Sequence, residues 1–208
     1  MNHLDDTLEA LDETLAAALE QVLAAEAISG ADDATVLRAM AITAHMQRRL
    51  DGLLTELVGE VDVRDTAQPT ANGIVMRSGY RNLNDLLQQV TLRTPQTVSA
   101  LTRVARAVRR PVALCTGEVL PPELPALRAA LLEGAVGIEG VTAVLGPLRE
   151  LHCAVGTERM REAERVLADA VRGTLTAPDD APGDASMPPL GGRDLRNLAR
   201  DLSFRLDP

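Results

Sequence analysis

Apolar residues recur every three or four positions along most of the chain, and this spacing constrains the fold more than any other feature. It is clearest near the N-terminus, where steps of four and three alternate through Leu4, Leu8, Leu11, Leu15, Ala18 and Val22. This period is that of an amphipathic α-helix, and its alternation forms a heptad seam. No part of the sequence has the two-residue alternation typical of strands. We therefore expect an all-α fold.

Residues 1–65 predict a long helical hairpin. Ser29-Gly30 ends its first helix, and Asp32 or Asp33 can cap the second, which places an acidic residue where the helix dipole favours it. At 1.5 Å per residue the second helix would be about 50 Å long. An extended helix pair of this kind often serves as a dimerisation arm.

The first helix of this hairpin is acidic over its whole length. Residues 4–22 carry six aspartates and glutamates and no basic residue. Like charges three and four residues apart destabilise a helix, so this one needs a partner surface, within the chain or on another copy. We expect a homodimer whose contact residues are Leu4, Leu8, Leu11, Leu15 and Val22.

Residues 66–175 predict a helical core that contains a basic helix. Asn82 caps a short helix that ends near Val90, and Thr94 with Pro95 opens the basic helix over 94–110. The succession of helix, short turn and helix is compatible with a helix-turn-helix motif.

Glycine and proline divide the remainder of the chain into shorter segments. The helices expected there cover residues 121–133, 138–145 and 157–175. Pro147 is expected at or near a helix boundary, and Thr157 is expected to cap the helix that follows it. Residues 176–192 would form a flexible loop, and residues 193–208 a last helix that packs back on the core. The 208 residues fit a single domain.

Composition excludes several classes of protein. Aromatic residues make up 1% of the chain, which argues against nucleic-acid modules that stack bases on aromatic side chains. Cys115 and Cys153 cannot supply a four-thiolate metal site or a disulfide framework. No apolar run approaches the roughly 20 residues of a membrane span, and the N-terminus is acidic rather than signal-like. We expect a cytoplasmic protein that has no membrane partner.

The sequence contains no motif for catalysis or metal binding. None of the three histidines, His3, His45 and His152, belongs to a Glu-x-x-His or His-Glu-x-x-His pattern. His152 and Cys153 are neighbours, so on a helix their side chains diverge instead of forming a catalytic dyad. We expect no enzymatic activity, no metal and no cofactor.

Basic residues are concentrated in the middle of an acidic chain. The formal net charge is −9, yet residues 66–110 hold seven of the 21 arginines against a single acidic residue. On the helix over 94–110, the side opposite the apolar face carries Gln96, Ser99, Arg103, Arg106 and Arg110. This basic side could bind double-stranded DNA, or it could neutralise the acidic N-terminal segment.

The DNA hypothesis assigns two kinds of contact to these residues. Gln96 and Arg103 would reach base edges, while Arg93, Arg106 and Arg110 would bind phosphates. The hypothesis requires the polar side of the helix to lie free in solvent.

Four stretches carry a resemblance to a known family. They are Arg77-Ser78-Gly79-Tyr80, the pair Arg109-Arg110, the run Thr116–Pro122 with Leu124-Pro125, and the close from Leu202 to Pro208. With these stretches the chain resembles the actinobacterial domain of unknown function numbered 222, also called the 13E12 repeat family. Members of that family often have a histidine at the position of Gly140.

In that family a nuclease domain of the HNH type commonly follows the closing motif, so the resemblance implies a linked HNH endonuclease domain as a partner. The paired cysteines and histidine core of such a nuclease are absent from this sequence. Together with the heptad seam and the basic helix, this predicts a non-catalytic scaffold or oligomerisation domain that resembles the N-terminal region of HNH nuclease proteins and could engage DNA through the helix over 94–110. The alternative is a module for protein–protein interaction or regulation, of the immunity type, that does not bind DNA.

Overall fold

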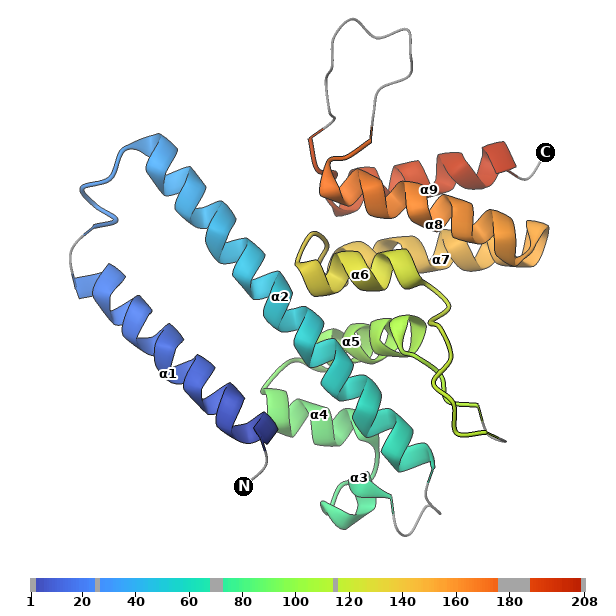
Figure 1. The fold of residues 1–208 in the computed structure, drawn as a ribbon, viewed down its shortest axis with the longest axis horizontal. Helices are drawn as coiled ribbons and strands as arrows, with labels where there is room; N and C mark the ends of the chain where they lie inside the picture. The colour runs from blue at the N-terminus through green and yellow to red at the C-terminus, as the bar shows by residue number, and fades with distance from the viewer. Residues whose placement is uncertain (1–2, 25–26, 68–72, 114–115, 176–187, 207–208) are drawn as a thin grey trace, which may run out of the picture. The chain divides into compact units, whose positions relative to one another are not determined.

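The computed structural model describes residues 3–24, 27–67, 73–113, 116–175 and 188–206. These ranges contain nine helices and no strand, which confirms the predicted all-α fold (Figure 1). Within the same ranges, β-pairing is limited to an isolated antiparallel bridge between Val112 and Val119. The chain divides into two compact units, residues 1–44 and residues 45–208.

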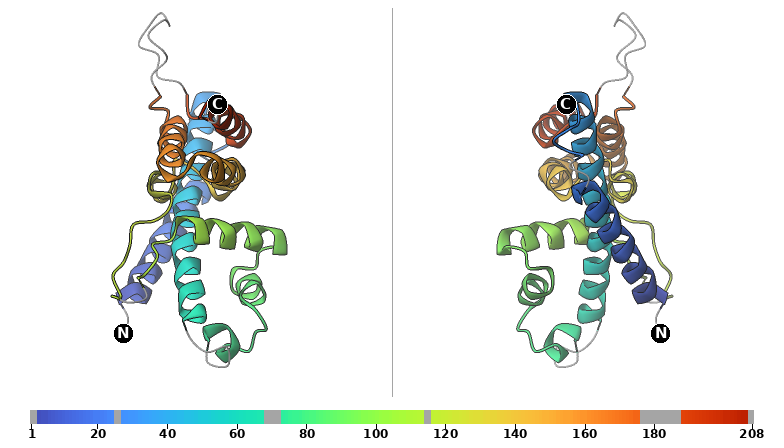
Figure 2. Two further views of the ribbon diagram at one scale, coloured as in Figure 1. Left: turned by 90° about the vertical axis from the view of Figure 1, so that its right-hand side faces the viewer. Right: turned by 90° about the vertical axis from the view of Figure 1, so that its left-hand side faces the viewer.

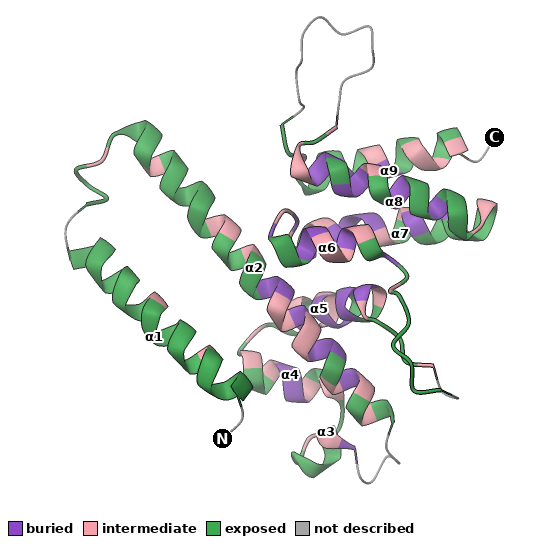
Figure 3. Cartoon of the chain, viewed as in Figure 1, coloured by how far each residue is buried: buried purple, intermediate pink, exposed green. Residues whose placement is uncertain are grey.

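The first unit consists of α1 (His3–Ala24) and the start of α2 (Asp33–Thr66). Asp32 caps α2, because its Oδ1 accepts a hydrogen bond from the backbone N–H of Thr35 at 2.7 Å. This cap is one of the two that the sequence allowed. No residue of α1 is buried, and Figure 3 shows the helix mostly exposed, with partly covered positions at Leu8 and Leu15. The apolar seam of α1 is thus not packed into a core.

In the second unit, the rest of α2 comes close to the backbone of α6 (Pro125–Glu133). A Cβ atom on Gly52 would lie 2.8 Å from the carbonyl oxygen of Leu131, so a glycine is required at this crossing. Gly134 ends α6 with a φ of 77°, in the left-handed region that favours glycine. Its carbonyl oxygen accepts a hydrogen bond from Nε of Arg48 at 2.6 Å.

Three helices follow α2: α3 (Ile74–Arg77), α4 (Leu83–Thr91) and α5 (Pro95–Val108). The predicted caps of α4 and α5 are confirmed. Asn82 accepts a hydrogen bond from the backbone of Asp85 at 2.9 Å, and Thr94 accepts one from the backbone of Thr97 at 3.4 Å. The short helix α3 was not expected from the sequence.

Helix α5 lies at the centre of the second unit. It contacts α4, α6 and α7, and six of its 14 residues are buried. These residues are Val98, Leu101, Thr102, Val104, Ala105 and Val108. A helix packed on several sides keeps only a narrow strip of its surface for a ligand.

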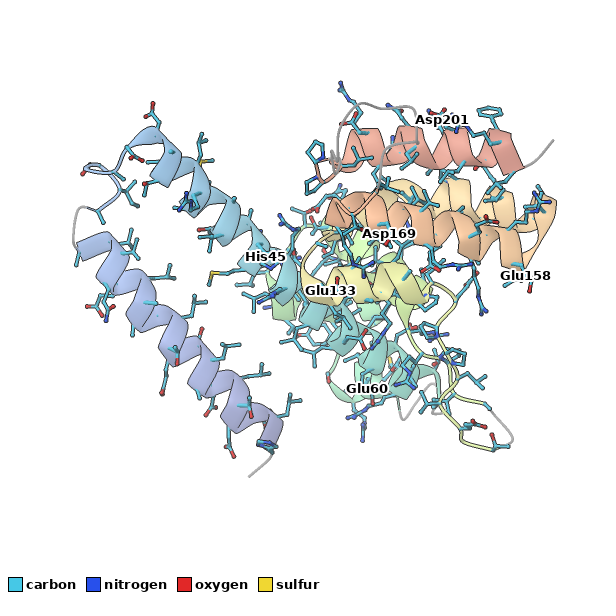
Figure 4. All side chains as sticks on the ribbon, turned by 45° about the horizontal axis from the view of Figure 1, so that its top comes forward. His45, Glu60, Glu133, Glu158, Asp169 and Asp201 are labelled. Carbon is cyan, nitrogen blue, oxygen red and sulfur yellow. The ribbon has the colours of Figure 1, made fainter. Side chains whose placement is uncertain are left out.

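Four helices complete the second unit: α6, α7 (Ile138–Val155), α8 (Thr157–Arg172) and α9 (Gly192–Leu206). Figures 1 and 2 show α7, α8 and α9 side by side, and α9 contacts both of the others. A single apolar cluster of leucine, valine and alanine runs from Val58 of α2 through α5 to α9. Arg172 adds a polar link between α6 and α8, 2.7 Å from Glu133 and 3.8 Å from Asp169, and Figure 4 labels both carboxylates.

The prediction for Pro147 is wrong, because this residue lies inside a continuous α7. A proline removes one hydrogen-bond donor from a helix and favours a break. Here Val144 and Leu148 on either side of it are both buried in the same apolar cluster. Packing of α7 on its neighbours therefore holds the helix together across the proline.

Two predicted helix starts also shift. α6 begins at Pro125 rather than at Pro121, and the residue that precedes α8 is Gly156, so Thr157 opens the helix without capping it. Cys115, most of the predicted loop over 176–192, and the closing pair Asp207-Pro208 lie outside the described residues.

Candidate anion-binding cleft

Arg93, one of the predicted DNA contacts, forms an ion pair with a carboxylate of α2. Its Nη2 donates a hydrogen bond to Oδ1 of Asp51 at 2.7 Å, and both side chains are largely buried. The pair fixes the turn between α4 and α5 against α2.

Arg106 is engaged in the same way, by Asp62 of α2. The carboxylate of Asp62 is 5% exposed and accepts hydrogen bonds from Nη2 and Nε of Arg106, the shorter at 2.7 Å, and one from Nη1 of Arg109 at 3.2 Å. The hydrogen bond to Asp62 raises the pKa of the Arg106 guanidinium, which burial opposes. The expectation that the polar side of this helix lies free in solvent is therefore wrong for Arg106.

These pairs agree with the alternative interpretation, in which basic residues neutralise acidic ones of the predicted hairpin. Asp51 and Asp62 both belong to its second helix. The side chains of the remaining predicted contacts, Gln96, Arg103 and Arg110, are exposed and form no hydrogen bond or ion pair within the described ranges. They do not converge, because Arg110 lines a shallow pocket against α2 whereas Arg103 lines a separate cleft.

The cleft that Arg103 lines has a volume of about 660 Å³. Its walls come from α5, α7 and α9, and small residues such as Ala107, Ala143 and Gly146 leave room between them. Five arginines line it: Arg103, Arg106, Arg149, Arg196 and Arg200.

Positive charge in this cleft is only partly neutralised. Arg106 is held by Asp62, but the other four arginines are exposed and have no carboxylate within ion-pairing distance among the described residues. Two glutamates, Glu123 and Glu150, also line the cleft. An excess of arginine in a concave site raises the local concentration of anions.

The wall of the cleft also contains a polar group without a partner. Oγ1 of Thr142, on α7, is shielded from solvent and has no hydrogen-bond partner in the described structure. Buried hydroxyls are usually paired, so this group is a candidate donor to a bound water or ligand.

The predicted dimer contacts share one helix face but are not buried. Leu4, Leu11 and Val22 are each close to half exposed, while Leu8 and Leu15 are somewhat more covered. Leu19 and Leu23, which flank the seam, are exposed as well.

Groups with potential for other chemistry are dispersed. Cys153 is a free, exposed thiol, and no cluster of three or more potential metal ligands occurs within the described ranges. No described helix is long and apolar enough to cross a membrane.

One carboxyl group, Glu164 of α8, is fully buried. Its Oε1 accepts a hydrogen bond from the backbone N–H of Leu127 at 2.8 Å and so caps α6, whose own sequence supplies no cap. Burial raises the pKa of Glu164; hydrogen bonds from Leu127 and Ala126 and the charges of Arg161 and Arg165 oppose this rise.

Comparison of the chain with protein-family models, with curated proteins and with solved structures finds no match. The resemblance described from the sequence therefore stays a prediction.

Sequence reasoning missed three of the cleft's arginines, Arg149, Arg196 and Arg200. Arg196 and Arg200 are four residues apart on α9, so a scan for arginines on one helix face would have found this pair. Their approach to Arg103 depends on the packing of α9 against α7 and of α7 against α5, which local sequence does not encode.

Proposed function

We propose that the chain is a non-catalytic helical scaffold that forms a homodimer through α1. The observation that carries this proposal is that α1, a 22-residue amphipathic helix, buries none of its residues. Most stabilisation of a protein helix comes from packing of its apolar face. The acidic residues at positions 5, 9 and 13 follow one another at intervals of four and repel, so α1 needs such packing more than most helices do.

The charge of α2 supports a second copy as the partner. Residues 34–50 contain Arg38, Arg48 and Arg49 and no acidic residue. They also expose apolar side chains, among them Leu37 at 66% and Met40 at 63%. Packing of α1 from one copy on this stretch of another would join opposite charges and cover both apolar faces.

The expected dimer is of moderate strength. Covering a half-exposed leucine or valine contributes about 1 kcal/mol, and the sum over two copies is comparable with the cost of association. The dimer should therefore dissociate on dilution.

The test is the molar mass in solution over a concentration series, measured by light scattering after size exclusion. The wild type should change from monomer to dimer as its concentration rises, and Leu11→Glu should stay monomeric. Ala17→Glu adds the same charge on the opposite face of α1 and is the matched control, which should dimerise like the wild type.

Circular dichroism of both variants separates loss of dimer from loss of fold. A wild type that stays monomeric at the highest concentration would contradict the proposal. It would favour the alternative, in which the apolar face of α1 binds a different protein.

A further inference from the structure

We propose that the cleft between α5, α7 and α9 binds phosphate groups, supplied by the backbone of a nucleic acid or by a free polyphosphate. This site goes beyond the scaffold function, since every residue that lines it belongs to the second unit and none to α1. It also differs from the DNA interface predicted from sequence. Among the predicted DNA contacts, only Arg103 both lines the cleft and lacks a carboxylate partner in the described part of the chain.

The arrangement of charge is the first argument. Arg103, Arg149 and Arg196 come from three different helices, and Arg200 lies one turn after Arg196. Like charges that a fold gathers in one concavity repel one another unless an anion lies among them. Several other arginines of this unit, such as Arg128 with Glu56 at 2.7 Å, are neutralised by carboxylates, whereas these four share one cleft and have no such partner among the described residues.

The chemistry of the side chains is the second argument. A guanidinium group presents a planar fork of donors that matches two oxygens of a phosphate, and it stays charged at any physiological pH. Four such groups offer more charge than one carboxylate can neutralise, whereas successive phosphates or a polyphosphate can neutralise them. Glu123 and Glu150 limit the excess charge and disfavour ligands of low charge density.

The size of the cleft is the third argument. A volume of about 660 Å³ lies in the middle of the range for sites that take ligands much larger than a single ion. The small residues Ala107 and Gly146 keep the cleft open, so an extended chain of phosphates can enter it.

Binding of a fluorescent duplex DNA of mixed sequence, followed by anisotropy from about 50 to 200 mM salt, tests the proposal. Four arginines that each meet one phosphate predict a log–log slope of about −3.6. Arg149→Ala with Arg196→Ala should lower the magnitude of this slope by about 1.8 and weaken binding roughly ten-fold at low salt. Arg106 is left unchanged, because it joins α5 to α2 through Asp62.

The matched control is Arg193→Ala with Arg205→Ala. It removes two exposed arginines of α9 that do not line the cleft, and its binding should equal that of the wild type. Competition by tripolyphosphate distinguishes the two sources of phosphate. The ligand is a free polyphosphate if tripolyphosphate binds, DNA does not, and Arg149→Ala with Arg196→Ala abolishes the binding of tripolyphosphate.

Three results would overturn the proposal. The first is that neither DNA nor tripolyphosphate binds at low salt. The second is that the cleft variant and the control variant lose the same amount of binding affinity. The third is that polyglutamate binds as tightly as DNA. None of these outcomes depends on whether the chain dimerises, because Leu11→Glu leaves every residue of the cleft in place.

Discussion

Asp62 of α2 and Arg106 of α5 form a two-pronged ion pair, in which Oδ1 lies 2.7 Å from Nη2 and Oδ2 lies 3.2 Å from Nε. The carboxylate is almost fully covered, while the guanidinium is 57% exposed. The pair therefore resembles neither a surface ion pair nor a fully buried one. It joins the long helix α2 to the centre of the second unit.

Removal of this carboxylate should destabilise the protein measurably. Asp62→Ala leaves Arg106 and Arg109 close together with no counter-charge, and we expect a loss of about 2 kcal/mol in the free energy of unfolding. Urea denaturation measures this change. Glu60→Ala is the control, because the pair of Glu60 with Arg64 is more than half exposed on both sides and should contribute less than about 0.5 kcal/mol. Equal effects of the two substitutions would contradict the prediction.

Glu164 should make stability depend on pH. Burial raises its pKa in the folded protein above the value of about 4.3 in an unfolded chain, so the folded state retains the proton over a range in which the unfolded state has lost it. The stabilisation that results is complete below the unfolded pKa and is lost as pH rises through the folded pKa.

Glu164→Gln cannot ionise and keeps an oxygen for the N–H of Leu127. Its free energy of unfolding should therefore rise relative to the wild type as pH increases from about 4 to about 8. Urea titrations across this range measure the difference. Glu162→Gln, an exposed neighbour on α8, should show no such trend, and a pH-independent difference for Glu164→Gln would refute the prediction.

Gly52 and Gly59 of α2 should respond to alanine in opposite directions. Alanine in a helix interior is normally favoured over glycine by up to about 1 kcal/mol. At Gly52 the added Cβ would lie 2.8 Å from the backbone of Leu131, so α2 and α6 would have to separate, at a cost of about 1–3 kcal/mol.

At Gly59 the nearest atom, Cβ of Arg109, is 3.8 Å away, which is an ordinary contact. Thermal denaturation should give a lower melting temperature for Gly52→Ala and an unchanged or higher one for Gly59→Ala. The prediction fails if both variants melt above the wild type.

Thr142 should tolerate the loss of its hydroxyl. Its Oγ1 has no partner in the described structure, so Thr142→Val should leave the free energy of unfolding unchanged or raise it by up to about 1 kcal/mol. Thr55→Val is the contrast, because the Thr55 hydroxyl donates to the carbonyl oxygen of Asp51 at 2.7 Å and its loss should cost about 1 kcal/mol. Chemical denaturation of the two variants tests this difference. If Thr142→Val lowers the free energy of unfolding more than Thr55→Val does, the prediction is wrong and the Thr142 hydroxyl binds a water molecule.

Local chemistry made several elements of the fold predictable from sequence. Asp32, Asn82 and Thr94 each cap a helix through a backbone N–H three residues later, and this contact needs no information from distant parts of the chain. The apolar period identified the all-α class for the same reason. Pro147 was misplaced because its local preference for a break is outweighed by packing of α7.

The candidate site was less predictable, because it depends on which helix faces meet. The sequence indicated a basic side on α5 but left open whether DNA or acidic residues of the chain would face it. Asp51 and Asp62 settle this for Arg93 and Arg106 through the docking of α2. Arg149 and Arg196 join Arg103 only because α7 and α9 pack together, a long-range contact that no local pattern reports.

The cap of α6 has a consequence for biosynthesis. Glu164, which closes the first turn of α6, lies 37 positions after Leu127 in the chain. On the ribosome, α6 is therefore synthesised before the carboxylate that completes it. We expect α6 and α8 to become ordered together, as one cooperative step late in translation, instead of in the order in which they are made.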